Sequence, residues 1–67
     1  MDIRDVKKNL NRKVRYTDGY GSQSEYILSA CVLRKNKKTN GFYYQAELQD
    51  IKVKSLLYCG LETIEEE

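Results

Sequence analysis

Residues 42–50 read Phe-Tyr-Tyr-Gln-Ala-Glu-Leu-Gln-Asp, and this stretch decides the fold of the chain. From Phe42 to Gln49, apolar or aromatic side chains at even positions alternate with mostly polar side chains at odd positions. A period of two is typical of a β-strand with one buried face and one wet face. Half-wet strands indicate an antiparallel sheet, because parallel sheets are usually covered on both faces. We therefore expect the side chains at 42, 44, 46 and 48 to be buried.

The rest of the chain supplies partners for this strand. The segment 25–36 is apolar on both faces near its middle, which indicates a central, strongly bent or doubly covered strand. The Asn40-Gly41 pair predicts a tight hairpin turn before residue 42. A loop at 18–24 contains two glycines and two serines. In all we expect four strands, at residues 13–17, 25–36, 42–51 and 56–59.

A short helix is expected at residues 2–10. Asp2 is a good N-cap, and Ile3, Val6 and Leu10 fall on one stripe. This stripe could bind the groove of a partner, but we interpret it as packing on the protein's own sheet. Residues 61–64 predict a 3₁₀ turn or a short last strand, and 65–67 a frayed acidic tail.

These elements predict one domain spanning residues 1–67. A four-stranded meander of this size would curl to hide its apolar face, which gives a small SH3-like half-open barrel or a bent antiparallel meander. A flat sheet with the helix across one face is the alternative. A chain of 67 residues leaves a marginal stability of roughly 3–5 kcal/mol.

Composition argues for the cytoplasm. No apolar run approaches the roughly 18 residues that span a bilayer, and the N-terminal residues do not resemble a signal peptide. The two cysteines, Cys31 and Cys59, lie in apolar runs, where a reduced cysteine behaves as a small hydrophobe. A disulfide across neighbouring strands is the alternative, and would need an oxidising compartment. We expect no membrane contact.

Three stretches carry a resemblance to other proteins. They are residues 26–35 (Tyr-Ile-Leu-Ser-Ala-Cys-Val-Leu-Arg-Lys), 41–50 (Gly-Phe-Tyr-Tyr-Gln-Ala-Glu-Leu-Gln-Asp) and 57–65 (Leu-Tyr-Cys-Gly-Leu-Glu-Thr-Ile-Glu). With them the chain resembles small uncharacterised proteins of integrative conjugative elements of Gram-positive bacteria. The resemblance covers about residues 10–65 and implies an accessory role on a mobile element. It implies no activity and no functional residues.

The residue types argue against catalysis. The chain has no histidine, which removes the usual general base at neutral pH. A structural zinc site needs four Cys or His ligands, and only two cysteines are present. No phosphate-binding loop or nucleophile motif occurs. We expect no enzyme, no cofactor, no metal and no small-molecule substrate.

Charge is distributed unevenly along the chain. Residues 1–54 carry 12 basic and 6 acidic side chains, a net charge of +6, whereas residues 55–67 carry four acidic side chains and no basic one. Part of the excess lies at the predicted hairpin tip, which could bind a phosphate backbone. Lysines at such a tip also keep a domain soluble and discourage edge pairing. The candidate nucleic-acid contacts are Arg34, Lys35, Lys37 and Lys38.

Tyrosine is the other marked feature of the composition. Four of the six tyrosines are expected in or at the core: Tyr16, Tyr26, Tyr44 and Tyr58. Tyr43 is expected on the wet face of its strand and Tyr20 in a loop. Exposed tyrosine is a common anchor in binding, although cross-strand packing would also place Tyr43 there. The candidate partner contacts are Tyr20, Tyr43 and Gln45.

The function is not determined by these patterns. They favour a non-enzymatic adaptor of a mobile element that contacts another protein, and the alternative is nucleic-acid binding through the basic hairpin tip.

Overall fold

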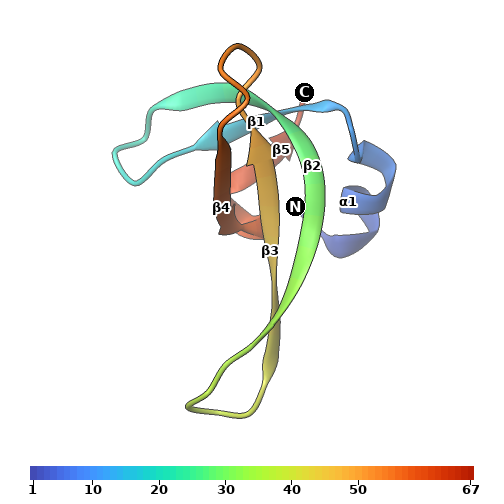
Figure 1. Cartoon of the computed structure of the whole chain (residues 1–67), viewed down its shortest axis with the longest axis vertical. Coiled ribbons are helices and arrows are strands. Elements are labelled where there is room, and N and C mark those ends of the chain that lie inside the picture. Colours follow the sequence, from blue (N-terminus) through green and yellow to red (C-terminus); the bar gives the residue numbers. More distant parts are fainter.

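The computed structural model, which describes residues 1–67, contains one open antiparallel sheet with strand order β4-β3-β2-β1-β5 and one short helix (Figure 1). The mainly β prediction is confirmed, but the sheet has five strands and not four. The elements in chain order are α1 (Ile3–Asn9), β1 (Lys13–Thr17), β2 (Gln23–Lys35), β3 (Phe42–Gln49), β4 (Leu56–Gly60), the 3₁₀ turn η1 (Leu61–Thr63) and β5 (Ile64–Glu66).

The fifth strand combines Ile64, which was expected in a 3₁₀ turn or a short last strand, with Glu65 and Glu66, which were expected to fray. β5 pairs with β1, and Ile64 lies opposite Tyr16 while Glu65 lies opposite Arg15. The side chain of Ile64 is only 1% exposed, so burial of one apolar residue fixes the segment to the sheet. Glu66 accepts a hydrogen bond of 2.9 Å from the Asn9 side chain, which joins the end of the helix to this strand. The prediction of a frayed acidic tail at 65–67 is therefore wrong for Glu65 and Glu66, while Glu67 lies beyond the strand.

Strand β2 lies at the centre of the sheet and is bent. Its first part pairs with β1 and its second part with β3, and the pairing register shifts between Leu28 and Ala30. This shift is a β-bulge in which Ser29 is the extra residue, and a bulge bends the strand that carries it. Even-numbered side chains face the core before Ser29, and odd-numbered ones share that face after it. The bulge explains why both Leu28 and Cys31 face the core, although they are three residues apart in the sequence.

A small core lies between the curved sheet and the helix. Seven side chains form it: Val6, Val14, Leu28, Ala46, Leu48, Cys59 and Ile64. The Asp2 side chain caps the helix by accepting a hydrogen bond of 2.8 Å from the Arg4 amide. Val6 is buried and Ile3 packs against the core, as the stripe predicted. Leu10 is 41% exposed instead, because the helix ends at Asn9.

The three hairpin loops share one construction. In each, an Asx side chain at the first loop position accepts backbone hydrogen bonds from later loop residues: Asp18 from Tyr20 and Ser22, Asn36 from Lys38, and Asp50 from Lys52 and Val53. The expected tight turn at Asn40-Gly41 is wrong. Only Asn40 adopts a positive φ (58°), and the loop is closed by the Asn36 amide on the Gly41 carbonyl at 2.7 Å. The loop is longer than a two-residue turn because Asn36 accepts hydrogen bonds from the amides of Lys38 and Asn40.

The β2–β3 hairpin projects beyond the core as a two-stranded arm, which we define as residues 30–44 (Figure 1). The pairing of β4 with β3 stops at Gln45, and that of β1 with β2 begins at Ile27, so neither strand flanks the arm. Phe42 is 67% exposed and Tyr44 47%, whereas Ala46 and Leu48 are fully buried. The expected burial of alternate residues therefore holds only where the core reaches, and fails at positions 42 and 44.

The contrast between core and arm makes a prediction about stability. Leu28→Ala should remove about 2–5 kcal/mol from the free energy of unfolding, which is comparable to the whole stability of a domain this small. Leu33→Ala, on the same strand and the same face but 56% exposed, should cost less than about 1 kcal/mol. Urea unfolding followed by circular dichroism measures both. Equal losses in the two variants would contradict the placement of the core.

Candidate interaction surface on strands β2, β3 and β4

The side of the sheet that faces away from the core carries a row of polar and aromatic side chains. Arg34 lies opposite Tyr43, and Glu47 lies opposite Tyr58. Residues opposite one another in antiparallel strands share a face, as do alternate residues of one strand. We call this surface the outer face and define it as Ser29 and Arg34 of β2, Tyr43, Gln45 and Glu47 of β3, and Tyr58 of β4.

Glu47 is held at the centre of the outer face by two hydroxyl groups. The Tyr58 hydroxyl donates to Glu47 Oε2 at 2.7 Å, and Ser29 Oγ donates to Oε1 at 2.8 Å. The hydrogen bond from Tyr58, and after it the one from Ser29, lowers the pKa of Glu47. The same bond raises the pKa of Tyr58, because the phenol would lose its acceptor contact on ionising. Glu47 is thus an oriented carboxylate at neutral pH.

Arg34 is oriented by two neighbours but has no counter-ion. Its Nε donates to Gln45 Oε1 at 2.6 Å, and its guanidinium carbon lies 5.7 Å from the centre of the Tyr58 ring. This distance is in the range of a cation–π contact. The only ion pairs of the chain are Arg4–Asp2 and Arg15–Glu65. The terminal nitrogens of Arg34 therefore remain available for a partner.

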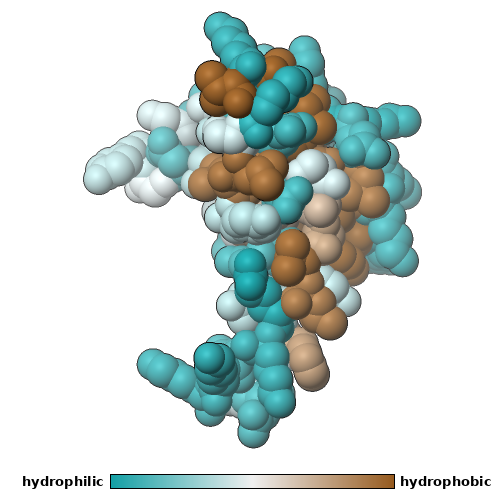
Figure 2. All heavy atoms as spheres, in the orientation of Figure 1, coloured by the Kyte–Doolittle hydropathy of each residue, from teal (hydrophilic) through white to brown (hydrophobic).

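The arm has a second exposed surface on the opposite side, where the core face of the sheet continues past the core. Leu33 lies opposite Tyr44, and Lys35 lies opposite Phe42. We call this surface the inner face of the arm and define it as Leu33, Lys35, Phe42 and Tyr44. Figure 2 shows hydrophobic side chains continuing from the body onto the upper part of the arm, with hydrophilic side chains at its tip.

The structure brings some of the predicted site residues together and separates others. Tyr43 and Gln45 share the outer face. Tyr20 is 99% exposed but lies in the β1–β2 loop, at the opposite end of β2 from the arm tip. The predicted basic group is divided, because Arg34 lies on the outer face, Lys35 on the inner face, and Lys37 and Lys38 in the loop.

Two residues of the outer face were missed by the sequence analysis. Tyr58 was expected at the core, together with Tyr44, but the two are 44% and 47% exposed. Alternation in β4 could have revealed Tyr58, since its neighbours Leu57 and Cys59 both face inward. Ser29 could not have been found in this way, because its orientation depends on the bulge. Tyr16 and Tyr26 do pack against the core, with their rings edge to face at 5.8 Å.

The two cysteines lie on one row of the core face, separated by a strand. Cys31 of β2 lies opposite Ala46 of β3, which lies opposite Cys59 of β4. Two strand spacings amount to roughly 9.5 Å, which is beyond the reach of a disulfide. The disulfide alternative is therefore wrong, and both thiols are free. Burial raises the pKa of Cys31 and of Cys59, so both favour the unreactive thiol form.

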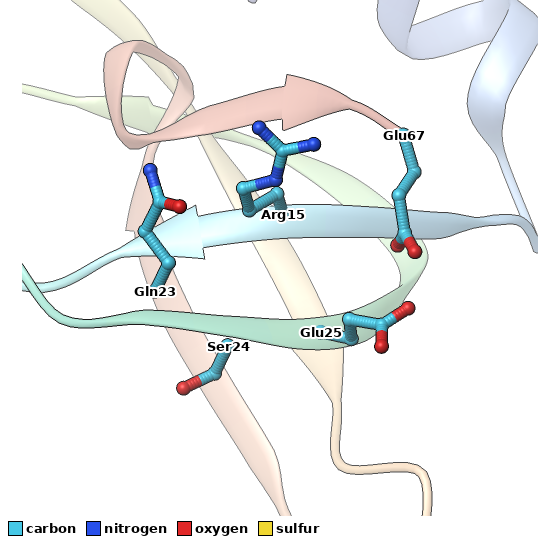
Figure 3. A pocket seen from close by; sticks show the side chains of 5 residues that line it. All are labelled: Arg15, Gln23, Ser24, Glu25 and Glu67. Atoms are coloured by element: carbon cyan, nitrogen blue, oxygen red, sulfur yellow. The ribbon is translucent and has the colours of Figure 1, made fainter.

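A shallow hollow lies beside β1 and the first residues of β2, at the opposite end of β2 from the arm tip; Figure 3 shows the side chains that line it. Its volume is about 270 Å³, and it is lined by Arg15, Gln23, Ser24, Glu25 and Glu67, with no hydrophobic residue. The side chains of Glu25 and Glu67 point toward one another (Figure 3), and their hydrogen bond raises the pKa of Glu67. Binding pockets are mostly apolar and concave, so we place no ligand here.

No group of three or more His, Cys, Asp or Glu side chains is arranged to hold a metal ion. The one α-helix has seven residues and is too short to cross a bilayer. Comparison of the chain with protein-family models, curated proteins and solved structures finds no match.

The Glu47 network yields a prediction that can be measured directly. Tyr58→Phe should raise the pKa of Glu47 toward its ordinary value, because it removes the hydrogen bond that lowers this pKa the most. A lowered pKa contributes stability above the unfolded value of about 4.3, and that stability is lost as the pH falls through the folded value. The acid side of the stability profile should therefore be flatter in Tyr58→Phe than in the wild type.

A ¹³C NMR titration of the Glu47 carboxyl group measures this pKa. Tyr43→Phe is the matched control, since the donors to the Glu47 carboxylate are Ser29 and Tyr58, and loss of the Tyr43 hydroxyl should leave the pKa of Glu47 unchanged. An unaltered Glu47 pKa in Tyr58→Phe would contradict the network.

Proposed function

We propose that the protein is a non-enzymatic binding module that contacts another protein through the arm and the adjoining outer face. The observation that carries this proposal is the exposure of large side chains on both faces of the arm: Leu33 (56%), Phe42 (67%) and Tyr44 (47%) are neighbours on the inner face, and Tyr43 (44%) lies on the outer face. Contiguous exposed apolar and aromatic groups are typical of surfaces that bind a partner. Tyrosine and arginine are also the residues most often found at the energetic centre of such contacts.

The mixed charge of the outer face favours a protein over a nucleic acid as the partner. Arg34 offers a cation without a counter-ion, while Glu47 offers an ionised carboxylate on the same surface. A phosphate backbone would be attracted by the first and repelled by the second. A protein surface can present a group of each sign, and matching both gives specificity.

The proposal also includes a fold type, a cellular compartment and a role on a mobile element. The position of β5 beside β1, with the 3₁₀ turn between β4 and β5, supports a half-open SH3-like barrel as the closest description of the fold. The free thiols fit a reducing compartment, so we place the protein in the cytoplasm. The likeness of three segments to small proteins of integrative conjugative elements supports an accessory role on such an element.

The partner proposal predicts the result of an affinity capture. Wild-type protein should retain a partner from native-cell extract, and Tyr43→Ala should lose most of it because an aromatic anchor is removed from the outer face. Tyr20→Ala is the matched control, since Tyr20 is still more exposed but lies away from the arm. Quantitative mass spectrometry of the captured protein is the readout. Equal retention by wild type and Tyr43→Ala would reject the outer face as the contact.

Nucleic-acid binding through the arm tip is the second candidate. It is favoured by one observation: residues 26–46 contain Arg34, Lys35, Lys37 and Lys38 but no acidic residue. The arm is therefore uniformly basic even though the whole chain has a net charge of only +2. A basic two-stranded ribbon with aromatic side chains is able to follow a phosphate backbone and stack on bases.

Salt dependence distinguishes this second candidate. If it holds, fluorescence anisotropy with generic DNA and RNA should show affinity falling with salt, with a log–log slope of about 0.7–0.9 per neutralised phosphate. Lys37→Glu with Lys38→Glu should abolish binding. Lys52→Glu with Lys54→Glu, in the β3–β4 loop, is the matched control and should bind nearly as the wild type does. Absence of binding at low salt would remove the candidate.

A further inference from the structure

The arm exposes not only side chains but also an unpaired strand edge. Residues Ala30–Lys35 of β2 pair with β3 alone and the bulge residue Ser29 is unpaired, because β1 pairs with β2 only as far as Ile27 and the Arg12 and Asn11 contacts end at Leu28. In an antiparallel pair, alternate residues direct their N–H and C=O groups away from the partner strand. In Figure 1, β3 is the only helix or strand that runs beside the lowest part of β2, and it lies on one side of β2 only. This edge is a template for another strand.

The usual protections of a free edge are missing from its middle. Natural sheets protect edges with lysine, proline, bulges or a covering element. The segment Ala30–Leu33 has no charged residue and the chain has no proline; the bulge precedes the segment and the lysines follow it. An uncovered edge of this kind promotes aggregation unless a partner occupies it.

We propose that the partner adds an extended segment as a further antiparallel strand on the Ser29–Lys35 edge of β2. This inference rests on the proposed function and specifies the class of partner. A strand edge is recognised by the regular donors and acceptors of another peptide backbone, which a nucleic acid does not have. Antiparallel addition continues the pattern of the whole sheet.

The side chains around the edge define the sequence of that segment. On the inner face, Leu33 and Cys31 would contact alternate side chains of the added strand, which should therefore be apolar. At the tip, four cations and no acidic residue lie on the arm, so the neighbouring end of the segment should be acidic. Because an antiparallel strand begins where β2 ends, the acidic residues belong at the N-terminal end of the segment. A second copy of this chain would instead bring two basic arms together.

The test uses the whole chain and a blocked heptapeptide, acetyl-Glu-Glu-Val-Thr-Val-Thr-Val-amide, as the probe. Amide hydrogen exchange measured by NMR should slow at alternate residues of Ser29–Lys35, by about tenfold or more near saturation. The same peptide N-methylated at its valines lacks the backbone N–H groups that would donate hydrogen bonds to β2, and it should not bind. Binding in which the β2 edge exchanges as fast as before, or binding equally by the N-methylated peptide, would overturn the proposal.

Charge reversal tests the acidic end. The double substitution Lys35→Glu with Lys37→Glu should lower the affinity for the Glu-Glu peptide by at least about threefold. The affinity for a matched peptide in which both glutamates are replaced by glutamine should be nearly unchanged. Leu33→Ser, which the protein should tolerate because Leu33 is exposed, should weaken both peptides. No difference between the two peptides in any variant would overturn the acidic assignment.

The remaining outcomes separate this proposal from the one it rests on. No peptide binding at about 1 mM, together with capture of a partner that depends on Tyr43, overturns the added strand and leaves the binding module intact. Protection of the β2 edge in the free chain that increases with protein concentration, with dimers in sedimentation, identifies a second copy as the occupant and overturns the proposal. Protection of the edge by oligo(dT) and not by the peptide also overturns it. Capture that is insensitive to Tyr43→Ala counts against the outer face as the contact and does not bear on the added strand.

Discussion

The register of β2 on its two neighbours is the constraint on which the rest of the structure depends. This one strand pairs with β1 through its first part and with β3 through its second, and the bulge at Ser29 changes which side chains face the core between the two parts. Without the extra residue, Leu28 and Cys31 would lie on opposite faces, since strand side chains alternate. The bulge thus lets a single strand contribute to one continuous core on both sides of its bend.

The same bulge joins the core to the candidate surface. Its extra residue places the Ser29 hydroxyl against both the Glu47 carbonyl (3.0 Å) and the Glu47 carboxylate (2.8 Å). Glu47 in turn accepts from Tyr58, and the Tyr58 ring lies beneath Arg34. A chain of contacts across three strands therefore runs from the bend of β2 to the base of the arm. Side chains oriented in this way lose little conformational entropy when a partner binds, which favours affinity.

Much of the fold could be predicted from the sequence because local patterns carry it. The Asp2 cap, the alternation at Ala46 and Leu48, and the inward Val14 and Tyr16 of β1 each depend on near neighbours in the chain. The failures involve long-range information. Glu65 and Glu66 are held in a strand only because β1 presents a free edge, and Phe42 is exposed only because no third strand reaches it. The alternation of apolar and polar residues shows which side chains of a strand lie on the same face, but it does not show how far the core extends along that face.

The residues of the candidate site also fall into those that local pattern predicts and those that it does not. Tyr43 and Gln45 could be placed on the wet face from alternation alone, whereas their union with Arg34 and Tyr58 required the register of three strands. Tyr20 is nearly fully exposed, but it lies far from the other candidate residues and cannot form one binding surface with them.

The small core and the exposed arm are two consequences of one limit. The core has only seven apolar side chains, and neither β1 nor β4 extends far enough to cover the distal part of the β2–β3 hairpin. A shorter hairpin would have ended with the core, near Cys31 and Ala46. The additional residues bury little within the chain, so their contribution to its stability is small. They extend an otherwise marginal domain with aromatic groups, cations and a free strand edge, all of which gain contacts only when another molecule is present. The proposed binding role would account for the length of the hairpin, to which folding stability contributes little.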